Sequence, residues 1–86
     1  YGRHSPVHEV RLVRDLLDDV LRLSAGEQAH TVTRVTISLG GLTEIDPETF
    51  RSHFAFFARG TPAEHAELII EESDRRELRL ISFECE

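Results

Sequence analysis

The feature that most constrains the fold of this chain is the order in which helical and strand periodicities follow one another. Between residues 7 and 25, apolar residues recur every three or four positions, which predicts an amphipathic helix. Ser5 is the expected N-cap and Pro6 the first helical residue, and Gly26 is expected to end the helix in a left-handed conformation. The apolar stripe comprises Val10, Val13, Leu17, Val20 and Leu21, widened by Leu12, Leu16 and Leu23.

A strand and a second helix are expected next. The segment 31–41, TVTRVTISLGG, alternates apolar with polar residues and ends in a glycine pair, which predicts a strand with one buried face. The Asp-Pro-Glu sequence that begins at Asp46 is typical of an N-cap, a first helical proline and a favourable first-turn acid. A helix is therefore expected over 47–59, and its buried face should hold Phe50, Phe54 and Phe57.

Two further strands are expected over 66–72 and 77–86, joined by a short polar turn. The first of them should place Leu68 and Ile70 inward. In the last one the apolar alternation changes phase near Ile81, which indicates either a bulge or a strand end that is buried on both faces.

The resulting order, α-β-α-β-β, predicts an α+β fold. The simplest arrangement that buries every apolar stripe is a small two-layer sandwich, with two helices packed on one face of a three-stranded mixed sheet. The helical crossover should make the first two strands parallel, and the short last turn should make the second and third antiparallel. A chain of 86 residues has room for one domain with a single modest core.

Composition excludes several classes of function. The formal net charge of -6 and the absence of a basic stripe disfavour nucleic acid, and no apolar run approaches the roughly 20 residues that cross a bilayer. Cys85 is the only cysteine, so we expect neither a disulfide framework nor a paired-cysteine zinc site, and a reducing cytoplasm is the expected compartment. No nucleophile is accompanied by a base and an orienting group, so we do not expect an enzyme.

Four stretches together resemble the HypA/HybF family, the nickel metallochaperones of nickel-iron hydrogenase maturation. They cover almost the whole chain in the family's order: VHEVRLVRDLL, VTRVTISLGGLTEIDPETF, GTPAEHAELIIEE and ELRLISFECE. The resemblance implies a cytoplasmic accessory protein that binds Ni²⁺ weakly and hands it on. It also implies partners: a GTPase of the HypB type or the hydrogenase large subunit, with urease maturation proteins as further candidates.

The same resemblance implies the metal site. Val7-His8-Glu9 falls on the family's Met-His-Glu start, which makes His8 the nickel ligand and Glu9 its acidic neighbour, and Asp46 matches a position near the same region. A histidine that follows a free α-amine offers imidazole, amine and backbone nitrogens, a near-planar set that suits Ni²⁺. The ordinary interpretations stay open, because a first-turn histidine is often only solvated and Asp46 is fully explained as an N-cap.

The chain departs from the family in two places. The family carries a zinc module with paired CxxC motifs between its second and last strands, whereas here IEESDRRELRL joins them directly, so no zinc is expected. This describes either a natural zinc-less relative or a shortened chain. Residues 1–6 are interpreted as a vector-derived or leader segment ahead of a HypA-like domain at 7–86. If they are instead native, the amine next to His8 is displaced.

The alternative function is a docking module that has lost metal binding and only recognises a hydrogenase subunit or a maturation factor. The other histidines do not decide between the two functions. His4 belongs to the suspect leader, whereas His30 and His65 are expected at the surface. His53 lies between phenylalanines and is expected to be half-buried, without a partner that the sequence identifies.

Overall fold

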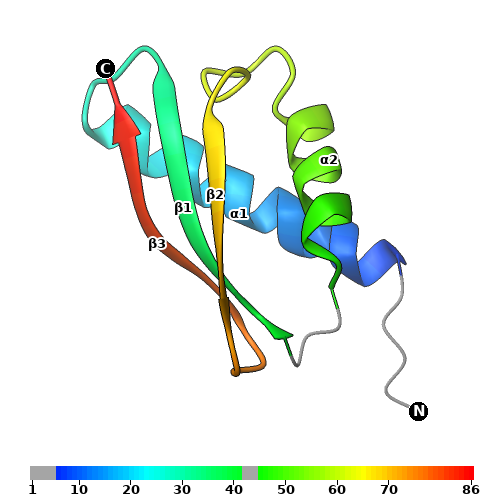
Figure 1. Ribbon diagram of the computed structural model, residues 1–86. Helices are drawn as coiled ribbons and strands as arrows, with labels where there is room; N and C mark the ends of the chain where they lie inside the picture. The colour runs from blue at the N-terminus through cyan, green and yellow to red at the C-terminus, as the bar shows by residue number, and fades with distance from the viewer. Residues whose placement is uncertain (1–5, 42–44) are drawn as a thin grey trace.

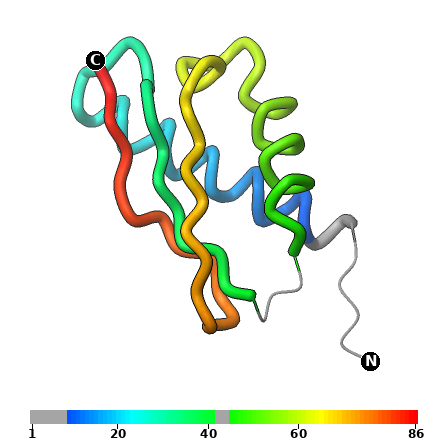
Figure 2. Tube along the Cα trace, viewed as in Figure 1, coloured from blue at the N-terminus to red at the C-terminus, as the bar shows by residue number. Residues whose placement is uncertain are grey.

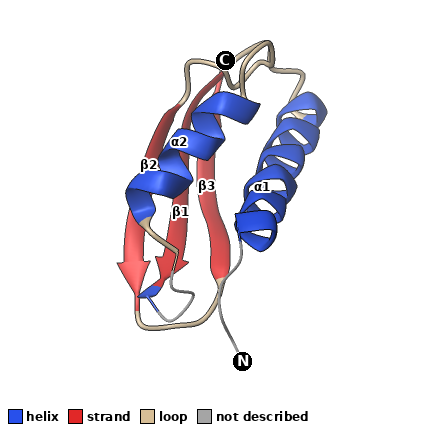
Figure 3. Cartoon of the chain, turned by 90° about the vertical axis from the view of Figure 1, so that its right-hand side faces the viewer, coloured by secondary structure: helices blue, strands red, loops and turns tan. Residues whose placement is uncertain are grey.

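The computed structural model describes residues 6–41 and 45–86, with side chains from Glu9 onward. The elements follow the predicted order: α1 (Pro6–Gly26), β1 (Val32–Gly40), α2 (Pro47–Phe57), β2 (Glu67–Ser73) and β3 (Leu78–Cys85). The strands form one mixed sheet in the order β2-β1-β3, and both helices cover the same face of it (Figures 1 and 3). The predicted α+β two-layer sandwich is confirmed.

The first strand lies in the middle of the sheet. It pairs with β2 in parallel, with Val35 opposite Leu68, and with β3 in antiparallel, with Val35 opposite Phe83. The last two strands run in opposite directions, as the short turn between them predicts. They are not neighbours, however, because β1 separates them.

The change of apolar phase in the last strand is a β-bulge. Thr36 lies opposite Ser82 and Ile37 opposite Leu80, so that Ile81 is the extra residue, and it is 51% exposed. Because of this extra residue, the apolar residues before the bulge and those after it lie on the same face of the sheet. The partly buried residues of β3 that pack against the core are accordingly Leu78, Leu80, Phe83 and Cys85.

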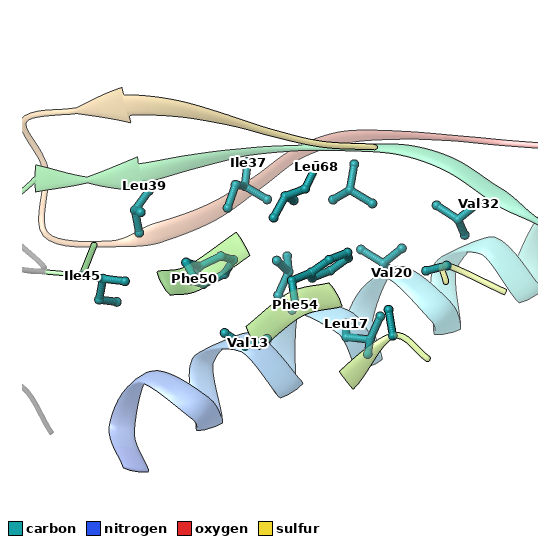
Figure 4. Packing of buried hydrophobic residues seen from close by; sticks show 14 residues of the cluster. Val13, Leu17, Val20, Val32, Ile37, Leu39, Ile45, Phe50, Phe54 and Leu68 are labelled. Atoms are coloured by element: carbon teal, nitrogen blue, oxygen red, sulfur yellow. The ribbon is translucent and has the colours of Figure 1, made fainter. Parts of the chain in front are cut away.

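The core lies between the helices and the sheet (Figure 4). It combines Val13, Leu17 and Val20 of α1, Phe50 and Phe54 of α2, and Val35, Ile37 and Leu39 of β1. Two predicted members differ. Phe57, the last residue of α2, is only partly buried. Leu23 is 41% exposed because it lies beside the edge strand β3, beyond which none of the described residues extends the sheet.

The predicted end of the first helix is wrong in one respect. Gly26 is the last residue of α1, but the left-handed residue is Gln28, with a φ of 60°. The Ala29 N–H donates to Ser24 O at 3.1 Å and the Gln28 N–H to Ala25 O at 3.0 Å, which is the Schellman pattern of helix termination. The helix therefore ends at Gly26, as expected, and the left-handed residue lies two positions beyond it. The expected N-cap, Ser5, lies outside the described residues.

The connection from β2 to β3 must pass the end of β1, because the two strands flank it. Gly40 makes this passage possible: a Cβ added there would lie 2.0 Å from Arg75 O, whereas the glycine N–H donates to Glu77 O at 3.1 Å. The glycine pair therefore ends the strand as predicted, and Gly40 also admits the crossing backbone.

Arg34 joins the three strands by ion pairs. Its guanidinium lies 3.2 Å from a Glu67 carboxylate oxygen on β2 and 3.1 Å from one of Glu84 on β3. The hydrogen bond to Glu67 and the charge of Glu84 raise the pKa of Arg34 above its usual value. All three side chains are substantially exposed, so these pairs contribute little to stability. In the described part of the chain, no helix is both long enough and apolar enough to span a bilayer.

Candidate metal site at the start of the first helix

His8 and Glu9 lie in the first turn of α1, as the His-Glu motif requires. The N-terminal half of this helix passes close to α2 within the helical layer (Figures 1 and 2). The backbone of His8 is helical, whereas its side chain is outside the described residues. Glu9 is only 6% exposed, although acidic side chains in a first turn are usually solvated. Its burial indicates that Glu9 faces the rest of the protein.

The Glu9 carboxylate meets His53 of α2. Glu9 Oε1 lies 3.7 Å from His53 Nδ1, and the two side chains are 8% and 33% exposed. Both facing atoms are shielded from solvent. The predicted half-burial of His53 is therefore confirmed, and its neighbour is one of the residues that the His-Glu motif singled out.

The sequence indicated part of this contact. His53 follows Phe50 by three residues and precedes Phe54 by one, so it lies on the stripe that α2 turns toward the core. A polar residue on a buried stripe needs a polar neighbour. The local pattern identifies this need, but it does not identify Glu9, which lies on the other helix.

Asp46 is the N-cap of α2, as predicted. Its Oδ2 accepts from the Thr49 N–H and from the Thr49 hydroxyl, both at 2.9 Å. These two contacts explain an aspartate at this position without a metal. A role for Asp46 in metal binding stays a prediction.

The remaining candidate ligands are scattered. Cys85 lies on β3, and His65 is in the loop before β2 with its side chain 89% exposed. Among the described residues, no three or more histidine, cysteine, aspartate or glutamate side chains come together as a metal site. The structure brings Glu9 together with His53.

Comparison with known proteins now decides the family. A family model described as "Hydrogenase/urease nickel incorporation, metallochaperone, hypA" matches residues 7–85. The chain belongs to the HypA family. The resemblance inferred from the four sequence stretches is thus confirmed.

Relatives within the HypA family come from bacteria and archaea. The chain is 32% identical to the hydrogenase maturation factor HypA of Aquifex aeolicus, over 92% of this chain and 80% of that protein. It is 36% identical to HypA of Archaeoglobus fulgidus, over 81% and 66%, and 39% identical to HypA of Chlorobium limicola, over 77% and 57%. The matched region is thus 57 to 80% of the length of these relatives.

Solved HypA structures have the same fold. The solution structure of the nickel metallochaperone HypA from Helicobacter pylori superposes with a TM-score of 0.77 at 20% identity, over 90% of this chain and 96% of that one. A second HypA solution structure gives a TM-score of 0.78 at 21% identity, over 94% and 98%. The α-β-α-β-β sandwich is therefore the fold of this family.

Proposed function

We propose that this chain binds Ni²⁺ as cargo at the start of α1 and delivers it during hydrogenase maturation, without catalysing a reaction. The observation that carries this proposal is the match of residues 7–85 to the nickel-incorporation family, with His8-Glu9 at its first positions. The relatives from Aquifex, Archaeoglobus and Chlorobium bear the name of hydrogenase maturation factor.

His8 is the proposed nickel ligand. An imidazole together with an amine and backbone nitrogens forms a nitrogen-rich set that suits Ni²⁺. The first N–H groups of a helix have no acceptor within it, so backbone nitrogens near His8 can bind a metal without breaking α1. A site near a chain end that takes few ligands from side chains exchanges few of them when it releases its metal, as delivery requires.

Glu9 and Asp46 are proposed as acidic neighbours of the ion. Burial of the Glu9 carboxylate supports this role for Glu9, because a carboxylate in a medium of low dielectric attracts a cation strongly. For Asp46 the support is its place at the start of α2, in the helical layer that also contains the start of α1. We further propose that the recipient is a HypB-type GTPase, the hydrogenase large subunit or a urease maturation protein, and that the protein works in the cytoplasm.

Calorimetric titration with Ni²⁺ tests the proposal. Protein that begins at Val7 should bind one Ni²⁺ per chain in the micromolar range, about 8 kcal/mol. His8→Ala should abolish binding, and protein that retains residues 1–6 should bind more weakly because the amine is displaced. His65→Ala is the matched control, since His65 is exposed in a loop and should not affect the titration.

A second candidate function is a docking module, which one surface feature favours. Leu23 and Ile81 are exposed and line a common depression with Leu80 and Phe83, at the unpaired edge of β3. Apolar side chains at a free sheet edge are typical of a protein interface. Nickel binding that does not depend on His8, or no nickel binding at all, would favour this function over the metallochaperone.

A further inference from the structure

The contact between Glu9 and His53 has an unusual feature on the histidine side. His53 Nδ1 is buried, and it forms no hydrogen bond with the residues that the structure describes. A buried nitrogen without a hydrogen bond is costly, and in folded proteins such an atom usually has a specific explanation, such as a water molecule or an ion. The atom that faces it, Glu9 Oε1, carries a negative charge when Glu9 is ionised.

The distance between these two atoms suits a shared ion. At 3.7 Å they are farther apart than the donor and acceptor of a good hydrogen bond. Two donor atoms that each lie about 2.1 Å from one ion are roughly 3.0 Å apart at a right angle and roughly 4.2 Å apart in line. The observed separation lies between these values, so an ion can bind both atoms with only small side-chain rotations.

The chemistry and the position of the pair agree with this geometry. Imidazole nitrogen is a ligand that suits nickel, copper and zinc, and a carboxylate oxygen adds negative charge to the site. One third of the His53 side chain is exposed, so an ion can approach the ring from solvent. Glu9 follows His8 directly, which places the pair next to the proposed nickel ligand.

We propose that His53 is a second imidazole ligand of the nickel site, and that His53 Nδ1 and Glu9 Oε1 bind the same ion. The inference rests on the proposed nickel function and adds to it a ligand from α2. The ion then connects the start of α1 to the middle of α2.

The competing explanation is structural. In that case Glu9 and His53 form a helix-to-helix contact that closes to a hydrogen bond and takes no part in metal binding. His53→Asn separates the two explanations, because the asparagine amide can donate to Glu9 as a histidine N–H does, yet it removes the imidazole.

The experiment combines X-ray absorption with calorimetry on protein that comprises residues 7–86 and is loaded with Ni²⁺ alone. The parent protein should show two imidazole ligands per nickel. His53→Ala and His53→Asn should each show one, and nickel affinity should fall about 10–100-fold in both, the loss typical when a group that holds or orients a metal ligand is removed. His65→Ala should keep both imidazoles and the parent affinity.

Three results would overturn the inference. They are a single imidazole in the parent protein, two imidazoles in either His53 variant, or parent affinity in His53→Asn. Far-ultraviolet circular dichroism shows whether each variant is folded. If His53→Ala does not fold, the result for His53→Asn alone tests the inference. A different result would contradict the proposed function itself. That result is the absence of His8-dependent nickel binding in the parent protein.

Discussion

Phe54 and Phe56 lie two positions apart on α2 and have opposite environments. Phe54 is 2% exposed, with Val13, Ile37 and the rest of the core around it, whereas Phe56 is 58% exposed. Helical geometry explains the difference, because two residues correspond to about 200° around the axis. The same periodicity made the burial of Phe54 predictable.

Truncation of Phe54 should therefore be costly. Phe54→Ala removes a ring from a closed core and should lower the free energy of unfolding by about 3–5 kcal/mol. Phe56→Ala, the matched control on the same helix, should change it by less than about 1 kcal/mol. Urea titrations followed by circular dichroism measure both values, and similar losses in the two variants would contradict the packing of α2.

Residue contacts between elements were less predictable than burial. The stripe of α2 indicated that His53 is half-buried, and the His-Glu motif marked Glu9, but no local pattern connects them. Their contact depends on how α1 and α2 pack, which single-sequence periodicity does not encode. The expected metal set His8, Glu9 and Asp46 came from resemblance to a family and not from a local pattern in the sequence.

At the scale of elements, the contribution of the N-cap of α2 to stability can be measured separately. Asp46 accepts from the Thr49 N–H, which has no acceptor within the helix. Asp46→Ala should therefore destabilise the protein by about 0.5–2 kcal/mol, whereas Asp46→Asn keeps a capping oxygen and should cost much less. Thermal unfolding measures both. Equal losses would mean that the charge of Asp46, and not its capping oxygen, stabilises the helix.

Gly40 tests the passage of the β2–β3 connection over the end of β1. Gly40→Ala places a methyl group against the Arg75 carbonyl and should destabilise by about 1–3 kcal/mol, as other overpacked sites do. Gly26→Ala is the control, since nothing lies within 4 Å of a Cβ there and the residue is helical. This variant should stabilise by about 0.4–1 kcal/mol. A loss in Gly26→Ala as large as that in Gly40→Ala would contradict the close approach at Gly40.

Element types were predictable because each carries its own period, and the bulge at Ile81 was visible as a change of apolar phase. Two features were not. The left-handed residue after α1 is Gln28 and not Gly26, because the choice depends on where Ser24 and Ala25 find donors. The central place of β1 depends on the pairing of strands distant in sequence, which the alternation within each strand does not specify.

At the scale of the whole molecule, the core closes around apolar side chains from every element. We therefore expect the fold to form without a metal, unlike small zinc domains whose folding is coupled to binding. We expect purified protein to contain no stoichiometric zinc, and a chelator to leave its melting temperature unchanged. Elemental analysis and thermal unfolding measure both. One zinc per chain that survives chelation would reveal a site formed by the histidines or Cys85.

Nickel should nevertheless stabilise the folded protein, because the proposed site exists only when α1 is formed. An ion that binds the folded state alone, at a free concentration 100 times its dissociation constant, adds about 2.7 kcal/mol. For a domain of this size each kcal/mol raises the melting temperature by about 4–8 °C, so the total shift should be about 10–20 °C. Thermal unfolding of protein freed of residues 1–6 measures it. His8→Ala should lose the shift and His65→Ala should keep it, since only the first lies in the first turn of α1. An equal shift in both variants would place the bound nickel elsewhere on the molecule, and no shift in the parent protein would leave the exposed edge of β3 as the functional surface.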